Sequence, residues 1–161
     1  MDGAETKTTR NAVHVVAQAA RTLHLALLDG ARSRYELEHG PIEGPTALLQ
    51  LLMGSPEFEW LRELSKVMAD VDELLELTDL DDDDAAAVRA ELDALLGPGS
   101  EHTPFGERYR EALQADTDVV IAHGRLRNVL GALPIPSDAA RAGSSERRRG
   151  WATRRAERRR T

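Results

Sequence analysis

The sequence predicts an all-α protein, and three observations lead to this fold class. Aromatic residues make up 4% of the 161 residues, whereas Ala, Leu, Val, Glu, Asp and Arg dominate, a composition that suits helices better than sheets. Apolar residues recur at alternating three- and four-residue steps, the spacing of one helical face. Proline and glycine separate these segments. We therefore expect an antiparallel, up-and-down bundle of four main helices plus one short helix, formed by residues 9–136.

The first main helix is predicted to begin near Thr9. Residues 1–8 are polar, and we expect them to be frayed. The helix should continue to Gly40-Pro41, where glycine accepts a left-handed C-cap and proline cannot extend the hydrogen-bond ladder. The stripe that should face the core contains Val13, Val16, Ala20, Leu23 and Leu27.

Residues 46–53 are predicted to form the short helix. Its four leucines point in too many directions for an exposed element, so we expect it to be mostly buried. Ser55-Pro56-Glu57 then begins the second main helix with a hydroxyl cap, a proline in the first turn and an acid near the positive end of the helix dipole. The apolar seam of that helix contains Leu61, Leu64, Met68, Val71 and Leu75.

A turn rich in aspartate, residues 78–84, precedes the third main helix, which should end at Gly97-Pro98-Gly99. The last helical region begins at Thr103-Pro104 and regains its apolar period between Val119 and Leu133. Asp116-Thr117-Asp118 either breaks this region or lies on an exposed turn. Pro134 and Pro136 mark the end of the folded domain.

The charge is distributed very unevenly along the chain. Residues 141–161 contain nine Arg and two Glu, a net charge of +7. Because the whole chain has a net charge of −7, residues 1–140 carry a net charge of −14. Residues 137–161 also lack an apolar period, which predicts a disordered, basic C-terminal tail. We accordingly expect that deleting this tail leaves the melting temperature almost unchanged.

Composition excludes several classes of site and location. The chain has no cysteine, which excludes disulfides, thiolate catalysis and cysteine-based metal centres. The acidic N-terminus is unlike a signal peptide, and no apolar run approaches the roughly 20 residues that a membrane-spanning helix needs. We therefore expect a cytoplasmic protein with no membrane partner, and the abundance of arginine and alanine is typical of a bacterial source.

Two of the five histidines fall beside predicted apolar faces. His24 lies next to the stripe of the first helix, and His123 has apolar neighbours at helical spacing. If the first and last helices are neighbours, these imidazoles approach each other, with Glu38 or Asp116 on similar faces, and a metal or haem site becomes conceivable. The alternative is that each is a core-edge residue satisfied by one hydrogen bond.

Other motifs do not meet the requirements of their sites. Glu36 and His39 have the Glu-x-x-His spacing of di-iron bundles, but no second such pair occurs. A calcium loop starting at Asp79 would place Asp84 where glycine is needed and Ala90 where glutamate is needed. Neither a phosphate-binding loop nor a nucleophile elbow is present, so no motif indicates an enzyme.

The basic tail has the composition of a nucleic-acid-binding arm. Guanidinium groups contact phosphates, and an aromatic ring can stack on a base. The same segment could instead fold back onto the acidic body or bind an acidic partner. The candidate contact residues are Arg147, Arg148, Arg149, Trp151, Arg154, Arg155, Arg158, Arg159 and Arg160.

The function class that remains is interaction through helix faces. Residues 46–53 and 56–75 carry more apolar positions than one seam requires, including Met53, Phe58 and Trp60. A surplus apolar patch is typical of a dimer or partner interface, although a wider core would also account for it. The sequence therefore favours a non-enzymatic bundle acting as a homodimer or adaptor, with the metal- or haem-binding and nucleic-acid-associated bundles as alternatives.

Overall fold

The computed structural model describes residues 2–161, and this part of the chain contains helices and no strands. The predicted all-α class is confirmed. No helix within these residues is both long enough and apolar enough to cross a membrane. The helices are α1 (Asp2–His39), α2 (Gly44–Gly54), α3 (Pro56–Glu59), α4 (Arg62–Leu75), α5 (Asp82–Leu96), the 3-10 helix η1 (Pro98–Ser100), α6 (Pro104–Ala115), α7 (Thr117–Leu130) and α8 (Asp138–Arg158).

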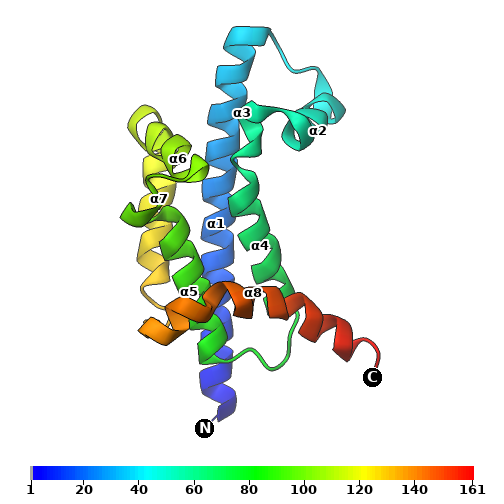
Figure 1. The fold of residues 1–161 in the computed structure, drawn as a ribbon, viewed down its shortest axis with the longest axis vertical. Helices are drawn as coiled ribbons and strands as arrows, with labels where there is room; N and C mark the ends of the chain where they lie inside the picture. Colours follow the sequence, from blue (N-terminus) through cyan, green and yellow to red (C-terminus); the bar gives the residue numbers. More distant parts are fainter. Residues whose placement is uncertain (1) are drawn as a thin grey trace.

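Helix α1 is the element around which the others pack. It contacts α4, α5, α6 and α7, and Figure 1 shows it running the length of the molecule between shorter helices. Each residue of the stripe predicted to face the core is buried. The helix begins at Asp2 and not near Thr9, because the Thr8 hydroxyl donates to the Ala4 carbonyl and the Thr9 hydroxyl donates to Asp82, so neither caps a helix start. Residues 2–8 are thus helical, not frayed.

The predicted antiparallel bundle of four main helices is not confirmed. The last helical region is divided at Asp116, whose backbone is extended and whose carboxylate accepts a hydrogen bond from the Asp118 backbone N–H at 2.9 Å. An N-cap with this geometry starts a new helix. Helices α6 and α7 therefore pack on each other as separate elements, and the aromatic residues of α6 join the core, where the Phe105 ring stacks on Tyr109 at 5.4 Å.

Helix α2 was expected to be mostly buried, and this prediction is wrong. None of its eleven residues is buried, and α3 is its main packing partner. The reason lies in the preceding connector, where Gly40 and Gly44 have φ values of 86° and 88°, which residues with a side chain rarely adopt. The chain turns away from α1 there, and Figure 1 shows α2 set apart from the body.

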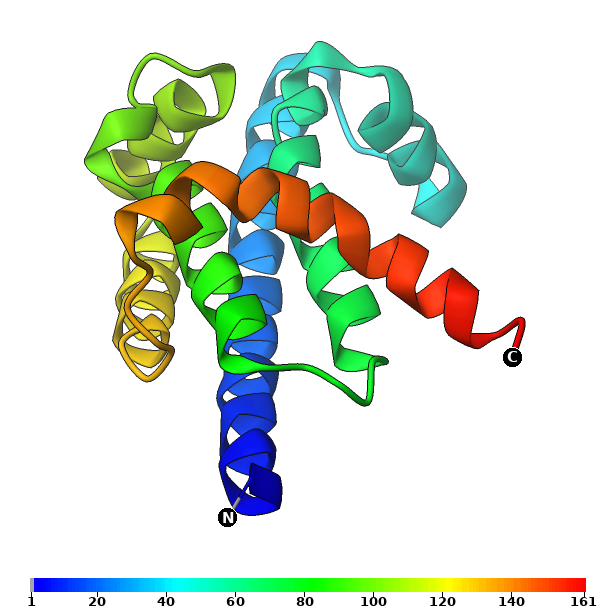
Figure 2. The same ribbon diagram turned by 60° about the horizontal axis from the view of Figure 1, so that its bottom comes forward.

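The prediction that residues 137–161 form a disordered tail is also wrong. Ser137 caps α8 by accepting a hydrogen bond from the Ala140 backbone N–H at 3.1 Å, and the helix then packs across α4 and α5. Figure 2 shows this crossing. Only Ser144 and Trp151 are buried in α8, with Trp151 0% exposed. Helix α8 is held against the body by one aromatic side chain and by ion pairs. Neither kind of contact produces a periodic apolar pattern in the sequence.

Candidate functional site

The contact between α5 and α8 centres on Asp84, a fully buried carboxylate in the first turn of α5. Its Oδ1 accepts hydrogen bonds from Trp151 Nε1 at 3.0 Å, from Arg147 Nε at 2.8 Å and from Arg154 Nη1 at 3.0 Å. Asp84 also forms a capping box with Asp81, which fixes the carboxylate at the helix N-terminus. A buried carboxylate is thus paired with two guanidinium groups and one indole N–H.

The pKa of Asp84 reports the balance between burial and these partners. Burial alone would raise the pKa, because a desolvated carboxylate favours the protonated form. The hydrogen bonds from Trp151, Arg147 and Arg154 outweigh burial, and the pKa lies below its ordinary value. Asp84 is therefore ionised at neutral pH in the folded protein.

A second buried carboxylate, Glu91, lies further along α5. It accepts hydrogen bonds from the Ser144 hydroxyl and, at 2.9 Å, from the Ser145 hydroxyl. Arg148 Nη1 lies 2.7 Å from Glu91 Oε2, and Arg148 Nε lies 3.0 Å from the carboxylate of Asp70 on α4. This cluster holds the first half of α8 against both α4 and α5.

The remaining arginines of α8 divide into two groups. Arg155 pairs with Glu73 at 2.7 Å and Arg158 with Asp79 at 3.2 Å, so these side chains also face the acidic body. Among the described arginines from Arg141 to Arg160, those that are exposed and form no ion pair are Arg149, Arg159 and Arg160. The segment has therefore folded back onto its own body, the second of the outcomes expected from its charge, and the nucleic-acid interface stays a prediction that rests on these three arginines.

The two candidate metal ligands have separate hydrogen-bond partners. His24 Nε2 of α1 lies 2.9 Å from the Ser65 hydroxyl of α4, and His123 Nδ1 of α7 bonds the Tyr109 hydroxyl of α6. One hydrogen bond each is the arrangement expected of core-edge histidines. Among residues 2–161, no group of three or more His, Cys, Asp or Glu side chains is arranged to hold a metal ion.

The two carboxylates that were expected to assist these histidines have other roles. Glu38 is exposed at the end of α1, where its Oε2 lies 3.8 Å from the neighbouring His39 Nε2. Asp116 is the N-cap of α7. The metal or haem site through His24, His123, Glu38 and Asp116 stays a prediction from the sequence.

Acidification is expected to destabilise the fold through His24 and His123. Burial lowers the pKa of His24, and burial together with the Arg127 charge lowers that of His123. Both folded pKa values lie below 6.5, so the unfolded chain binds more protons and stability falls as pH drops through 6.5. Chemical unfolding between about pH 7.5 and 5.5 should show a shallower loss of stability in a His24→Gln, His123→Gln variant than in a variant of the exposed His102, His102→Gln. Equal pH profiles would contradict this assignment.

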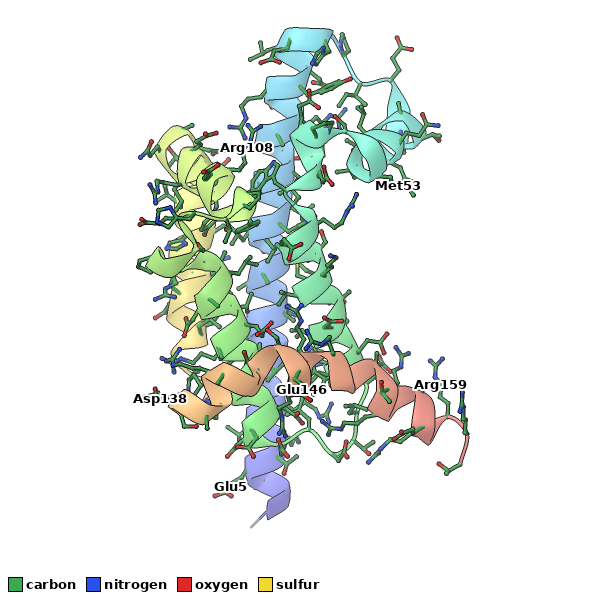
Figure 3. The ribbon with its side chains drawn as sticks, viewed as in Figure 1. Glu5, Met53, Arg108, Asp138, Glu146 and Arg159 are labelled. Atoms are coloured by element: carbon green, nitrogen blue, oxygen red, sulfur yellow. The ribbon has the colours of Figure 1, made fainter. Side chains whose placement is uncertain are left out.

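Helix α2 presents two exposed apolar side chains one helical turn apart. Leu49 is 57% exposed and Met53 is 70% exposed, and the Met53 side chain lies on α2 away from α1 in Figure 3. The other face of the helix is partly buried against the core through Ala47, Leu48, Leu51 and Leu52. Helix α2 contains no charged residue. We call the exposed side, defined by Leu49 and Met53, the α2 face.

The apolar surplus noted in the sequence is therefore divided between core and surface. Phe58 and Trp60 are buried, and only Met53 of the three residues singled out is exposed. The sequence analysis missed Asp84 and Glu91 as organising residues. The Asp-rich turn indicated helix capping, but no local signal distinguishes the one buried aspartate from its solvated neighbours.

Comparison with protein-family models, with curated proteins and with solved structures gave no match for this chain. The function has to be argued from the surfaces described above.

Proposed function

We propose that this protein acts through protein–protein interaction and that the α2 face is the contact between two copies of the chain. The observation that carries the proposal is an eleven-residue apolar helix with no buried residue. Leaving Leu49 and Met53 in water forgoes about 1.5–3 kcal/mol of burial free energy for each side chain. An interface that covers them recovers part of this energy.

A second copy fits the charge of the molecule better than an arbitrary partner does. The chain carries a net charge of −7, so two copies repel each other over most of their surfaces. The α2 face is uncharged, and two such faces can meet around a two-fold axis without bringing like charges into contact. Self-association through α2 therefore avoids the repulsion that other parts of the body would cause.

The size of the helix limits the strength of the dimer. Eleven residues at 1.5 Å per residue give a helix of about 16 Å, and two helices of this length bury less than the roughly 1,200–2,000 Å² of a stable interface. We therefore expect a reversible dimer that forms with rising concentration. Such a contact suits a protein that exchanges partners.

Sedimentation-velocity or light-scattering measurements over a concentration series test this proposal. The parent chain should show a mass that rises from monomer toward dimer. A Leu49→Glu, Met53→Glu variant should dissociate at least about tenfold more readily, since 1.4 kcal/mol corresponds to a factor of ten and four apolar contacts are lost per dimer.

The matched control is Ile121→Glu on α7, where the side chain is 62% exposed on a different helix. This variant adds the same kind of charge and should leave the association unchanged. A parent chain that stays monomeric at all concentrations overturns self-association through α2. A dimer that survives the Leu49→Glu, Met53→Glu substitutions shows that another surface forms it.

A further inference from the structure

A cavity of about 340 Å³ lies where α6, α7 and the η1 turn meet, on surfaces that the proposed dimer does not use. Two arginines and a histidine line it: Arg110 from α6, and His123 and Arg127 from successive turns of α7. One acid, Glu101, also lines it. Three potential donors to an anion therefore surround one space on a chain whose first 140 residues carry a net charge of −14.

The hydrogen bond between Tyr109 and His123 engages Nδ1 of the imidazole. Burial raises the pKa of the Tyr109 hydroxyl, so it stays protonated. Burial and the Arg127 charge lower the pKa of His123, so the ring is neutral at neutral pH. A neutral ring has one donor and one acceptor nitrogen, so in the tautomer in which the Tyr109 hydroxyl donates to Nδ1 the ring hydrogen lies on Nε2. In that tautomer His123 presents its N–H donor on the nitrogen that Tyr109 does not contact, and this is the tautomer that an anion would select.

The two guanidinium groups keep unused donors. Arg127 Nη1 donates to Asp93 Oδ1 at 2.9 Å, and Arg110 Nη2 lies 3.0 Å from Glu101 Oε2. A guanidinium has five N–H donors, so each of these contacts leaves several for another acceptor. Asp93 also lies within 3.9 Å of Arg89 and Arg141, so three arginines share this one carboxylate.

The wall of the cavity is held by close backbone packing. A Cβ at Gly106 would lie 1.8 Å from the Ser100 carbonyl oxygen, so only glycine permits the approach of α6 to η1. The Thr103 hydroxyl caps α6 by accepting a hydrogen bond from the Gly106 backbone N–H at 2.9 Å. These two contacts position α6 against η1 at the wall of the cavity.

We propose that this cavity binds the oxyanion group of a small molecule, a phosphate or a carboxylate, through Arg110, Arg127 and the Nε2–H of His123. Guanidinium groups form charge-assisted hydrogen bonds with both kinds of group. The volume lies within the range of small-molecule sites, and Leu96 and Leu113 supply apolar wall next to the charged groups. The ligand class is thus a small organic anion with one oxyanion head.

Nuclear magnetic resonance of the full chain tests the site with inorganic phosphate and with acetate as probes, at constant ionic strength. The ring signals of His123, assigned with His123→Gln, should shift in a saturable manner with at least one probe, while those of His24 stay fixed. A tighter response to phosphate indicates a phosphorylated ligand, and a tighter response to acetate indicates a carboxylate.

Arg127→Gln should weaken the response about tenfold or more, as loss of one charge-assisted contact predicts. Arg125→Gln is the matched control, because Arg125 is exposed on the same helix but does not line the cavity. Circular dichroism verifies folding, and Arg110→Gln replaces Arg127→Gln if the latter unfolds. No saturable shift with either probe, or equal weakening by Arg125→Gln and Arg127→Gln, overturns the proposal. Neither result bears on the α2 dimer.

Discussion

Replacing Trp151 with alanine is expected to lower the free energy of unfolding by about 3–5 kcal/mol, the cost of removing a buried aromatic side chain. Among the described residues Trp151 is the largest fully buried side chain, and it is the only large apolar residue that α8 buries. Its loss also removes the indole N–H donor from Asp84. For a chain of this length the melting temperature should fall by about 10 °C.

Thermal unfolding followed by circular dichroism measures the effect of Trp151→Ala. Thr153→Ala is the control, since Thr153 lies exposed on α8 two residues away. That substitution should change the melting temperature little. If Trp151→Ala melts with the parent, α8 does not pack on the body in solution, and the segment behaves as the disordered tail that its composition suggested.

Replacing Asp84 with asparagine is expected to cost about 3–5 kcal/mol, the usual effect of breaking a buried ion pair by removing one partner. The substitution keeps the size of the side chain but leaves Arg147 and Arg154 facing each other without the carboxylate between them. Asp83→Asn removes a charge from the adjacent, exposed position and should have a far smaller effect.

The pH dependence of stability identifies the Asp84 contribution independently. Its folded pKa lies below 3.8, the value for the unfolded chain, so the unfolded state binds more protons. The contribution is complete above 3.8 and disappears as the pH falls through the folded pKa. Acid unfolding of Asp84→Asn should therefore lack a component that Asp83→Asn retains. Identical acid profiles for the two variants would show that Asp84 is not the ionised partner of α8.

The parts of the fold that depend on apolar periodicity could be predicted from the sequence. The predicted stripe of α1 is buried, and a helix starts at Pro56 as predicted, although Ser55 makes no side-chain capping hydrogen bond. Of the seam predicted for the second helix, Leu61, Leu64 and Val71 are buried, whereas Met68 and Leu75 are only partly buried.

The docking of α8 could not be predicted in this way, because Arg147, Arg148 and Arg154 find carboxylates more than fifty residues away in the sequence. A charged helix carries no local sign of which distant charges it will meet.

The candidate sites, like the fold, could be predicted only in part from the sequence. The sequence identified His123 as a residue beside an apolar face, but its pairing with Tyr109 and its place with Arg110 and Arg127 depend on how α6 turns into α7 at Asp116. It also identified the leucines of α2 as a surplus and placed them in the core. In the structure the chain turns at Gly40 and Gly44, which have positive φ, and α2 lies outside the core. Composition alone does not give the direction of such a turn.

The order of α5 and α8 along the chain has a consequence for synthesis on the ribosome. The carboxylates of Asp79, Asp81 and Asp84 are made more than sixty residues before Arg147 and Arg154, the arginines that neutralise them. Until those arginines emerge, the nascent body holds like charges close together with no counterion from its own chain. Docking of α8 thus cannot precede the synthesis of Arg147 and Arg154, and a transcript truncated before Arg147 yields a chain in which Asp84 lacks its guanidinium partners.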